Sequence, residues 1–90
     1  MRKVNDNHGR EHTVHAWYIL VNGWEYYQTE PADEENIAYG FVHGLEDEWG
    51  SFSTDEMGEY ILAHAKGDEL NEIRPPIGWS WKEEVCTSSA

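Results

Sequence analysis

Three histidines near the start of the chain are the first residues whose types and spacing could do chemistry. His8, His12 and His15 lie four and three residues apart, so on a helix they would share one face and could ligate a divalent metal ion. Gly9 disfavours a helix, however, and a strand-like sequence begins at Val14, so the three imidazoles would not converge. We therefore expect no metal site, and a divalent-metal-binding protein that uses these histidines is kept as an alternative.

Clustered carboxylates are the second candidate for chemistry. Residues 33–35 and 46–48 are unbroken acidic runs, which suggests a calcium site or a pair of acids for hydrolysis. The EF-hand pattern is absent, and a general acid–base pair needs carboxylates from different elements that converge on a pocket. Acidic side chains that cluster in loops are normally solvated, so we expect neither a calcium site nor catalysis from them.

Nucleophiles and phosphate-binding loops add no further constellation. The single cysteine, Cys86, lies between two glutamates and a polar tail, and these surroundings disfavour the reactive thiolate. The chain has no Gly-x-Ser-x-Gly motif and no glycine-rich phosphate loop. We expect a protein that is not an enzyme, with no catalytic residue and no cofactor.

Charge is the strongest feature of the composition. The 90 residues include 18 acidic and 6 basic side chains, and the formal net charge is −12. Such a field repels nucleic acid and anionic membranes, and it speeds the encounter with basic surfaces. We expect no direct binding to nucleic acid or membrane, and a basic, nucleic-acid-binding protein as the partner. The polar first residues lack the apolar core of a secretory signal, which predicts a cytoplasmic location.

The elements that must position these residues are mostly strands. Residues 13–21 and 24–29 are rich in β-branched and aromatic side chains. Asn22 and Gly23 between them predict a two-residue hairpin turn, because both residues tolerate a positive φ. Further strand-like segments follow at residues 37–43, 48–53 and 79–82.

One helix is predicted after the fourth strand. Ser53 and Glu56 have the spacing of a capping box, which satisfies free amides at a helix start. Apolar residues recur at steps of three and four from Met57, and Lys66 followed by Gly67 suits the end of a helix. We therefore expect a helix over residues 54–66.

Together these elements predict one α+β domain. Its core would be a small antiparallel β-sheet of four to five strands that starts with a β-hairpin, with one helix packed on one face. Residues 1–12 would be a flexible polar arm, residues 13–85 the domain and residues 86–90 a disordered tail. The expected core side chains are Trp17, Ile19, Trp24, Ile37, Tyr39, Phe41, Phe52, Met57, Tyr60 and Ile61.

The middle of the chain carries a resemblance to a known family. It comprises Trp24-Glu25-Tyr26-Tyr27-Gln28-Thr29-Glu30, an acidic turn, Ala38-Tyr39-Gly40-Phe41-Val42-His43-Gly44, and the segment from Glu46 to Ser53. This pattern resembles the family known as domain of unknown function 2958, over about residues 24–57. Ser51 and Met57 depart from it, where the family has an aromatic residue and a leucine. The resemblance implies a compact sheet-plus-helix domain of the kind found on phages and plasmids, and it supplies no catalytic residue.

Charge and resemblance together predict a function. Small acidic anti-restriction and anti-CRISPR proteins occur on mobile elements, so we expect an acidic inhibitor that binds a basic nucleic-acid-handling protein as a monomer or homodimer. Mimicry of DNA is one way in which such an inhibitor could bind. A structural or homo-oligomeric accessory protein with a merely solvating acidic surface is the alternative. The expected contact residues are the acids Asp33, Glu34, Glu35, Glu46, Asp47, Glu48, Asp55, Glu56 and Glu59 and the rings of Tyr26, Tyr27 and Trp49.

Overall fold

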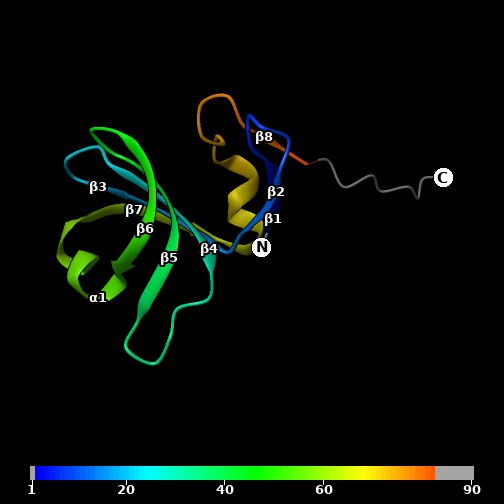
Figure 1. The fold of residues 1–90 in the computed structure, drawn as a ribbon. Coiled ribbons are helices and arrows are strands. Elements are labelled where there is room, and N and C mark those ends of the chain that lie inside the picture. Colours follow the sequence, from blue (N-terminus) through cyan, green and yellow to red (C-terminus); the bar gives the residue numbers. More distant parts are fainter. Residues whose placement is uncertain (1, 83–90) are drawn as a thin grey trace.

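The computed structural model describes residues 2–82, which form two antiparallel sheets and one short α-helix (Figure 1). The elements are β1 Arg2–Asn5, β2 Glu11–Val14, β3 Ala16–Leu20, β4 Glu25–Glu30, β5 Ile37–His43, β6 Asp47–Ser53, α1 Thr54–Met57, η1 Gly58–Tyr60, β7 Ile61–Lys66, η2 Gly67–Glu72 and β8 Ser80–Trp81. The expected class, mainly antiparallel sheet with a helix, is confirmed in this coarse form. Cys86 and the expected tail at 86–90 lie outside the described residues.

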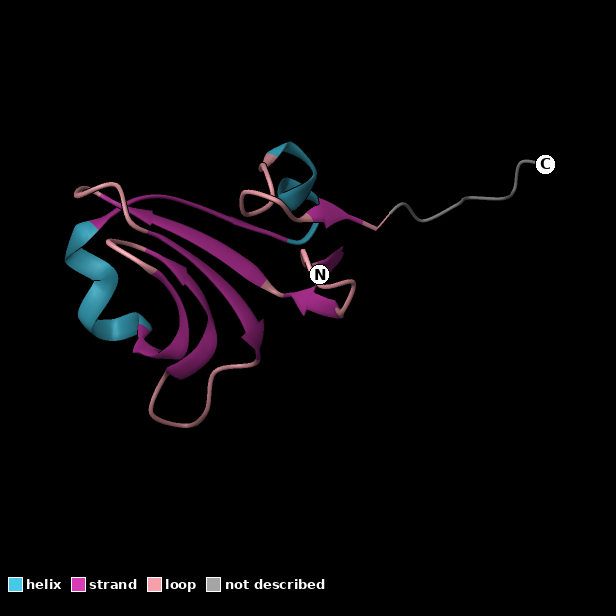
Figure 2. Ribbon diagram, turned by 45° about the horizontal axis from the view of Figure 1, so that its top comes forward, coloured by secondary structure: helices cyan, strands magenta, loops and turns pink. Residues whose placement is uncertain are grey.

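The larger sheet contains five strands in the order β6-β5-β4-β3-β7, and the smaller contains three in the order β2-β1-β8. Strands β3 to β6 follow one another as antiparallel neighbours, and α1 and η1 then carry the chain across to β7, which pairs with β3. Figure 2 shows the strands of the larger sheet curving together, with α1 at one end and the smaller sheet beyond the other. The edges of the larger sheet are therefore β6 and β7.

Residues 2–12 are not a flexible arm, contrary to the expectation. Strands β1 and β2 pair antiparallel, and β1 also pairs with β8. Val4 and Val14 are both fully buried, at 0% exposure. These two valines alternate with polar neighbours, so each strand buries one face against the rest of the core. The expected count of four to five strands was too low partly because these segments are short.

The predicted helix over residues 54–66 is wrong in its second half. Its start is as expected, because the Ser53 Oγ accepts the Glu56 backbone N–H at 3.2 Å. The α-helix ends at Met57, however, and Ile61–Lys66 is strand β7, paired with β3. The apolar residues within Ile61–Lys66 fit a strand as well as a helix, and pairing with β3 decides in favour of the strand.

The hairpin between β3 and β4 is confirmed, but its turn differs from the prediction. The Leu20 N–H donates to the Trp24 carbonyl at 2.9 Å, and the Gly23 N–H donates to the Leu20 carbonyl at 2.8 Å. Gly23 alone has a positive φ there, of 90°, whereas Asn22 does not. The turn therefore has three residues and ends in a left-handed glycine.

The five-stranded sheet buries a different hydrophobic cluster on each face. The cluster that we call the Tyr27 face packs against the smaller sheet and η2, and it contains Val4, Val14, Trp17, Tyr27, Phe41, Ala65 and Leu70, with Ile19, Ile73, Trp79 and Trp81 at its margin. The Tyr18 face contains Ala16, Tyr18, Leu20, Ala38, Val42, Phe52 and Met57, with Trp24, Tyr26 and Ile61 at its margin. Alternation along β3 to β6 assigns their side chains to these two faces. In β7 the register shift opposite Ile19 and Leu20 places Ile61 and Ala65 on different faces.

The expected core is partly correct. Trp17, Phe41, Phe52 and Met57 are buried. Tyr39 and Tyr60 are not, because they are 38% and 54% exposed. Ile19, Trp24, Ile37 and Ile61 are only partly buried. None of the helices formed by residues 2–82 has the length and apolar character needed to cross a membrane.

Candidate binding groove

Asp6 organises the turn between β1 and β2. Its Oδ1 accepts the backbone N–H groups of His8 and Arg10, at 2.8 and 2.9 Å, and its Oδ2 lies 2.8 Å from the His12 Nε2. The bond from His12, helped by the two backbone amides, lowers the pKa of Asp6 to about 2. The carboxylate therefore stays charged in neutral solution, and it fixes the orientation of the His12 ring.

The His12 ring joins the smaller sheet to the aromatic side chains of the larger one. Its centroid lies 4.8 Å from that of Trp49 and 5.2 Å from that of Trp79, on which it stacks. Trp79 in turn lies 4.7 Å from Phe41. Rings from β2, β5, β6 and the segment before β8 therefore meet at one place, where each limits the movement of the others.

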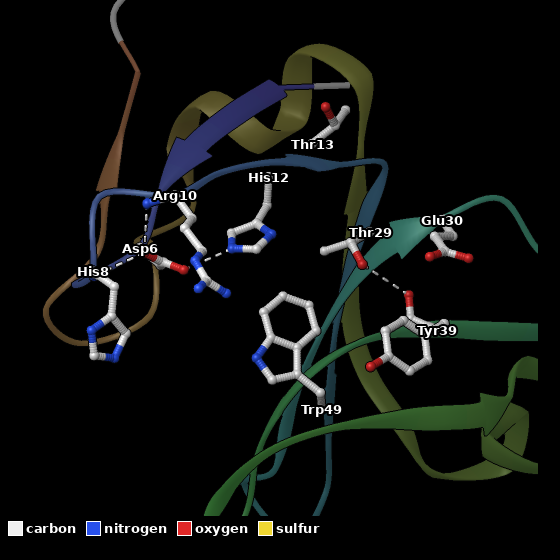
Figure 3. Close-up of a pocket in the computed structure, with 9 residues that line it drawn as sticks. All are labelled: Asp6, His8, Arg10, His12, Thr13, Thr29, Glu30, Tyr39 and Trp49. Atoms are coloured by element: carbon white, nitrogen blue, oxygen red, sulfur yellow. Dashed lines mark hydrogen bonds and ion pairs between the residues drawn. The ribbon is translucent and has the colours of Figure 1, made fainter.

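A groove of about 500 Å³ opens between the β1–β2 hairpin and the Tyr27 face (Figure 3). Its lining residues are Asp6, His8, Arg10, His12, Thr13, Thr29, Glu30, Tyr39 and Trp49. The rings of Tyr39 and Trp49 lie 6.0 Å apart at an angle of 19°, and each residue is 38% exposed. The groove therefore presents two nearly parallel aromatic rings to solvent.

The strand register places these two rings side by side. Phe41 pairs with Trp49 and Tyr39 pairs with Ser51, so Tyr39 and Trp49 are diagonal neighbours on one face of the β5–β6 hairpin. On the other side, the register between β4 and β5 shifts at Thr29, and Glu30 pairs with Tyr39. This bulge brings the Glu30 side chain to the same face as the Tyr39 ring.

A second hollow of about 340 Å³ adjoins the groove. It shares Glu30 and Tyr39 with the first, and its other lining residues are Pro31, Asp33, Ile37, Ala38 and Ser51. Because the two hollows share these residues, we refer to them together as the trough. Arg10 and His8 line only its part near β1 and β2, Asp33 lines only the other part, and Glu30 lines both.

The predicted acidic contact residues fall into two main groups at opposite ends of the β5–β6 hairpin. Residues 33–35 lie in the β4–β5 turn beside the start of α1, because the Asn36 side-chain amide donates to the Asp55 carboxylate at 3.0 Å. Residues 46–48 lie at the other end, where His43 pairs with Asp47. Glu59 belongs to neither group, because η1 lies beside the β3–β4 turn, where the Tyr60 carbonyl accepts the Val21 N–H.

The three predicted aromatic contacts have different positions. Trp49 lies in the groove, as described above. Tyr27 is only 2% exposed, so it cannot contact a partner, and its hydroxyl donates to the Arg74 carbonyl at 2.9 Å. Burial raises the pKa of this hydroxyl well above its usual range. Tyr26 is half-buried on the Tyr18 face, where its ring lies 5.0 Å from that of Phe52.

The histidines considered as metal ligands are not assembled into a site. His12 is held by Asp6, and His8 is exposed in the turn. Among residues 2–82, no group of three or more histidine, cysteine, aspartate or glutamate side chains is placed to hold a metal ion. His15 lies at the break between β2 and β3, and its backbone N–H donates to the Gln28 carbonyl at 2.7 Å.

The sequence did not reveal that Asp6, His12, Glu30 and Tyr39 line the groove, or that Trp79 packs against His12 behind it. Asp6 and the left-handed Gly9 carried a usable signal, because an aspartate three residues before a glycine is typical of a turn. The convergence of Trp79 with His12 carried none, since residues so far apart in sequence meet only through the pairing of β1 with β8.

Comparison with known proteins adds no identity to this geometry. No family model matches the chain, and neither a curated protein nor a solved structure shows a match to it.

Proposed function

We propose that this chain is a non-enzymatic acidic protein that binds a basic, nucleic-acid-binding host protein and inhibits it. The observation that carries this proposal is that few of the described carboxylates are paired with a basic side chain. Among residues 2–82, ion pairs engage only three carboxylates, those of Asp6, Glu11 and Asp47. The other described acidic side chains leave a large negative field for a basic surface to neutralise.

The placement of the acids supports contact with a surface that normally binds phosphates. The two groups at residues 33–35 and 46–48 are separated by the length of β5, Ile37–His43. At about 3.3 Å per residue this separation is roughly 20 Å. Roughly six base-pair steps of duplex DNA span the same distance, at about 3.4 Å each. The resemblance to phage- and plasmid-borne proteins adds a setting, the cytoplasm of a host, in which anti-restriction or anti-CRISPR inhibitors act.

Retention of a partner from host lysate tests the proposal. The chain is immobilised, and lysate is applied at about 100 mM and about 500 mM salt, because exposed charges are screened over about 10 Å at the lower concentration and about half that at the higher. We expect a nucleic-acid-binding protein that is retained at low salt and lost at high salt, and whose activity falls when the chain is added. Retention of no basic protein at either salt would overturn the proposal.

Three variants of equal charge change locate the contact. Glu34→Lys with Glu35→Lys alters one acidic group, and Glu46→Lys with Glu48→Lys alters the other; none of these side chains makes a hydrogen bond or ion pair within residues 2–82. Asp68→Lys with Glu72→Lys in η2 is the matched control. We expect weaker retention for the first two variants and little change for the third. Equal loss in all three would mean that net charge alone acts.

A homo-oligomeric accessory protein is the second candidate, and β7 favours it. This strand forms one edge of the larger sheet, and its sequence, Ile61–Lys66, contains no acid. Leu62 is 66% exposed on it, and Tyr60 and Val21 beside it are 54% and 65% exposed. Edge strands of this kind pair with other strands. A mass that rises with protein concentration in sedimentation, together with no retained partner, would favour this function.

A further inference from the structure

The trough beside β5 and β6 carries an inference about the ligand, which rests on the function proposed above. We propose that it binds a lysine or arginine side chain from an extended basic segment of the partner. The cation lies on the rings of Tyr39 and Trp49, and Glu30 and Asp33 supply the countercharge. Lysine and arginine bind to aromatic rings in this way when the charge lies within about 6 Å of the ring centre.

The two rings are held ready for such a ligand. Trp49 is supported on one side by Phe41, whose ring lies 5.5 Å away at 68°, and on another by His12 at 4.8 Å. Asp6 fixes His12 in turn, and the strand register fixes Tyr39 beside Trp49. A site that is already ordered loses little conformational entropy when a ligand binds, so a modest number of contacts is enough.

The charges of the trough select a cation. Glu30 belongs to both hollows, and Asp33 lines the second. Among residues 2–82 neither carboxylate makes an ion pair. Asp6, the third acid of the trough, is already engaged by His12. Glu30 pairs with Tyr39 in the strand register and is fully available to a bound cation. Asp33 lines the same hollow as Tyr39, and its Oδ1 accepts two backbone amides, so it can offer its Oδ2.

Arg10 sets the direction of the bound segment. It lines only the first hollow, in the β1–β2 turn, and its exposed side chain makes no hydrogen bond within residues 2–82. Its guanidinium group would repel a second cation, whereas it could donate hydrogen bonds to peptide carbonyl groups of the ligand. The basic side chain of the ligand therefore lies at the Glu30 end of the trough, and the neighbouring backbone of the ligand extends toward Arg10.

A defined peptide tests this site without knowledge of the partner. The probe is tetralysine with both ends blocked, titrated into the 15N-labelled chain while the tryptophan indole N–H signals are followed by NMR. We expect the Trp49 signal to move with the peptide and to stay still with the same peptide acetylated on every lysine. The lack of a difference between the two peptides would overturn the proposal, because acetylation removes only the charge.

Four variants distinguish binding of the peptide in the trough from general electrostatic attraction between the cationic peptide and the acidic chain. We expect Trp49→Leu to weaken binding of the peptide by about 2- to 30-fold, through loss of the cation–ring contact. Because this variant lacks the Trp49 indole, its binding is followed by the backbone amide signals of the labelled chain. Glu30→Gln, at an exposed position where folding is not at risk, should weaken it by about 2- to 5-fold. Tyr60→Leu and Glu72→Gln are the controls, because they remove an exposed ring and an exposed acid outside the trough and outside the two acidic groups.

The outcomes distinguish this proposal from the one on which it rests. Unchanged peptide binding by both Trp49→Leu and Glu30→Gln would remove the trough as the site, and salt-sensitive retention of a basic protein would still stand. Retention of no basic protein, with tetralysine still bound in a Trp49-dependent way, would overturn the inhibitor function and leave a lysine-binding trough.

Discussion

The two faces of the five-stranded sheet are covered in different ways. On the Tyr18 face, Met57 from the short α1 completes a cluster whose other buried members all come from β3, β5 and β6, within one continuous stretch of chain, and Ile61 of β7 lies only at its margin. The Tyr27 face depends on the two ends of the described chain, because Val4 and Val14 come from the smaller sheet and Leu70 from η2.

The difference explains where the trough lies. The smaller sheet packs over the face on which Tyr27 is 2% exposed, but it covers Tyr39 and Trp49 only in part. His12 contacts the Trp49 ring, and both Tyr39 and Trp49 remain 38% exposed. The cover of this face is therefore incomplete, because aromatic rings beside the buried cluster remain exposed. Aromatic rings of this kind contribute much of the binding energy at protein interfaces. The proposed binding site is thus the part of the Tyr27 face that the other described segments, within residues 2–82, leave exposed.

Removing the centre of the Tyr27 face should have the largest effect on stability. Tyr27→Ala deletes a buried ring and its hydrogen bond to the Arg74 carbonyl, so we expect the free energy of unfolding to fall by about 3–5 kcal/mol. Urea denaturation measures this change. Tyr27→Phe keeps the ring and loses only the hydrogen bond, so about 0.5–1.5 kcal/mol is expected for it. If both variants lowered the free energy of unfolding by the same amount, packing of the Tyr27 ring would not be what stabilises the Tyr27 face.

Two facing glycines test how closely the strands approach. A Cβ added at Gly40 would lie 1.9 Å from the Tyr27 carbonyl oxygen, whereas one at Gly50, its partner in β6, would meet nothing within 4 Å. We expect Gly40→Ala to destabilise the fold by about 1–3 kcal/mol, since backbone must move. Gly50→Ala should be neutral or stabilising by up to about 1 kcal/mol. Thermal denaturation of the pair measures both, and a similar cost for the two would contradict the close approach of β4 to β5.

The same contrast between local and distant contacts decides what could be predicted from the sequence. Strands β4, β5 and β6 were predicted to within a residue or two, because alternation and turn residues act over short distances. The break at His15 was missed, because it arises where the chain passes from β2 in the smaller sheet to β3 in the larger sheet. Strand β7 was missed because its pattern also fits a helix, and only the free edge of β3 distinguishes the two.

Turns show which local signals were present but unused. The turns that end at Gly9 and Asn36 repeat the geometry of the one that ends at Gly23, each with a residue of positive φ at its last position. Asp6 and Asp33 occupy equivalent places, and each Oδ1 accepts two backbone amides. This pattern could have predicted the β1–β2 hairpin and hence a folded N-terminus. It also shows that Asp33 stabilises a turn besides contributing charge.

The smallest effect, and the one most specific to the trough, should come from Asp6→Asn. The amide can keep the turn, so the variant mainly removes the charge that holds His12. Because the pKa of Asp6 falls from 3.8 to about 2 on folding, its charged form stabilises the native state above about pH 4, and this contribution disappears as the pH falls toward 2. We therefore expect the variant to unfold at a lower temperature than the parent chain near pH 6, with the gap closing as the pH falls. The ring signals of His12 and Trp49 should shift in the same variant while those of Tyr18 and Phe52 stay fixed, since only the Tyr27 face depends on the β1–β2 hairpin. A gap that stayed constant from pH 6 to pH 2 would show that the Asp6 charge does not hold this wall of the trough.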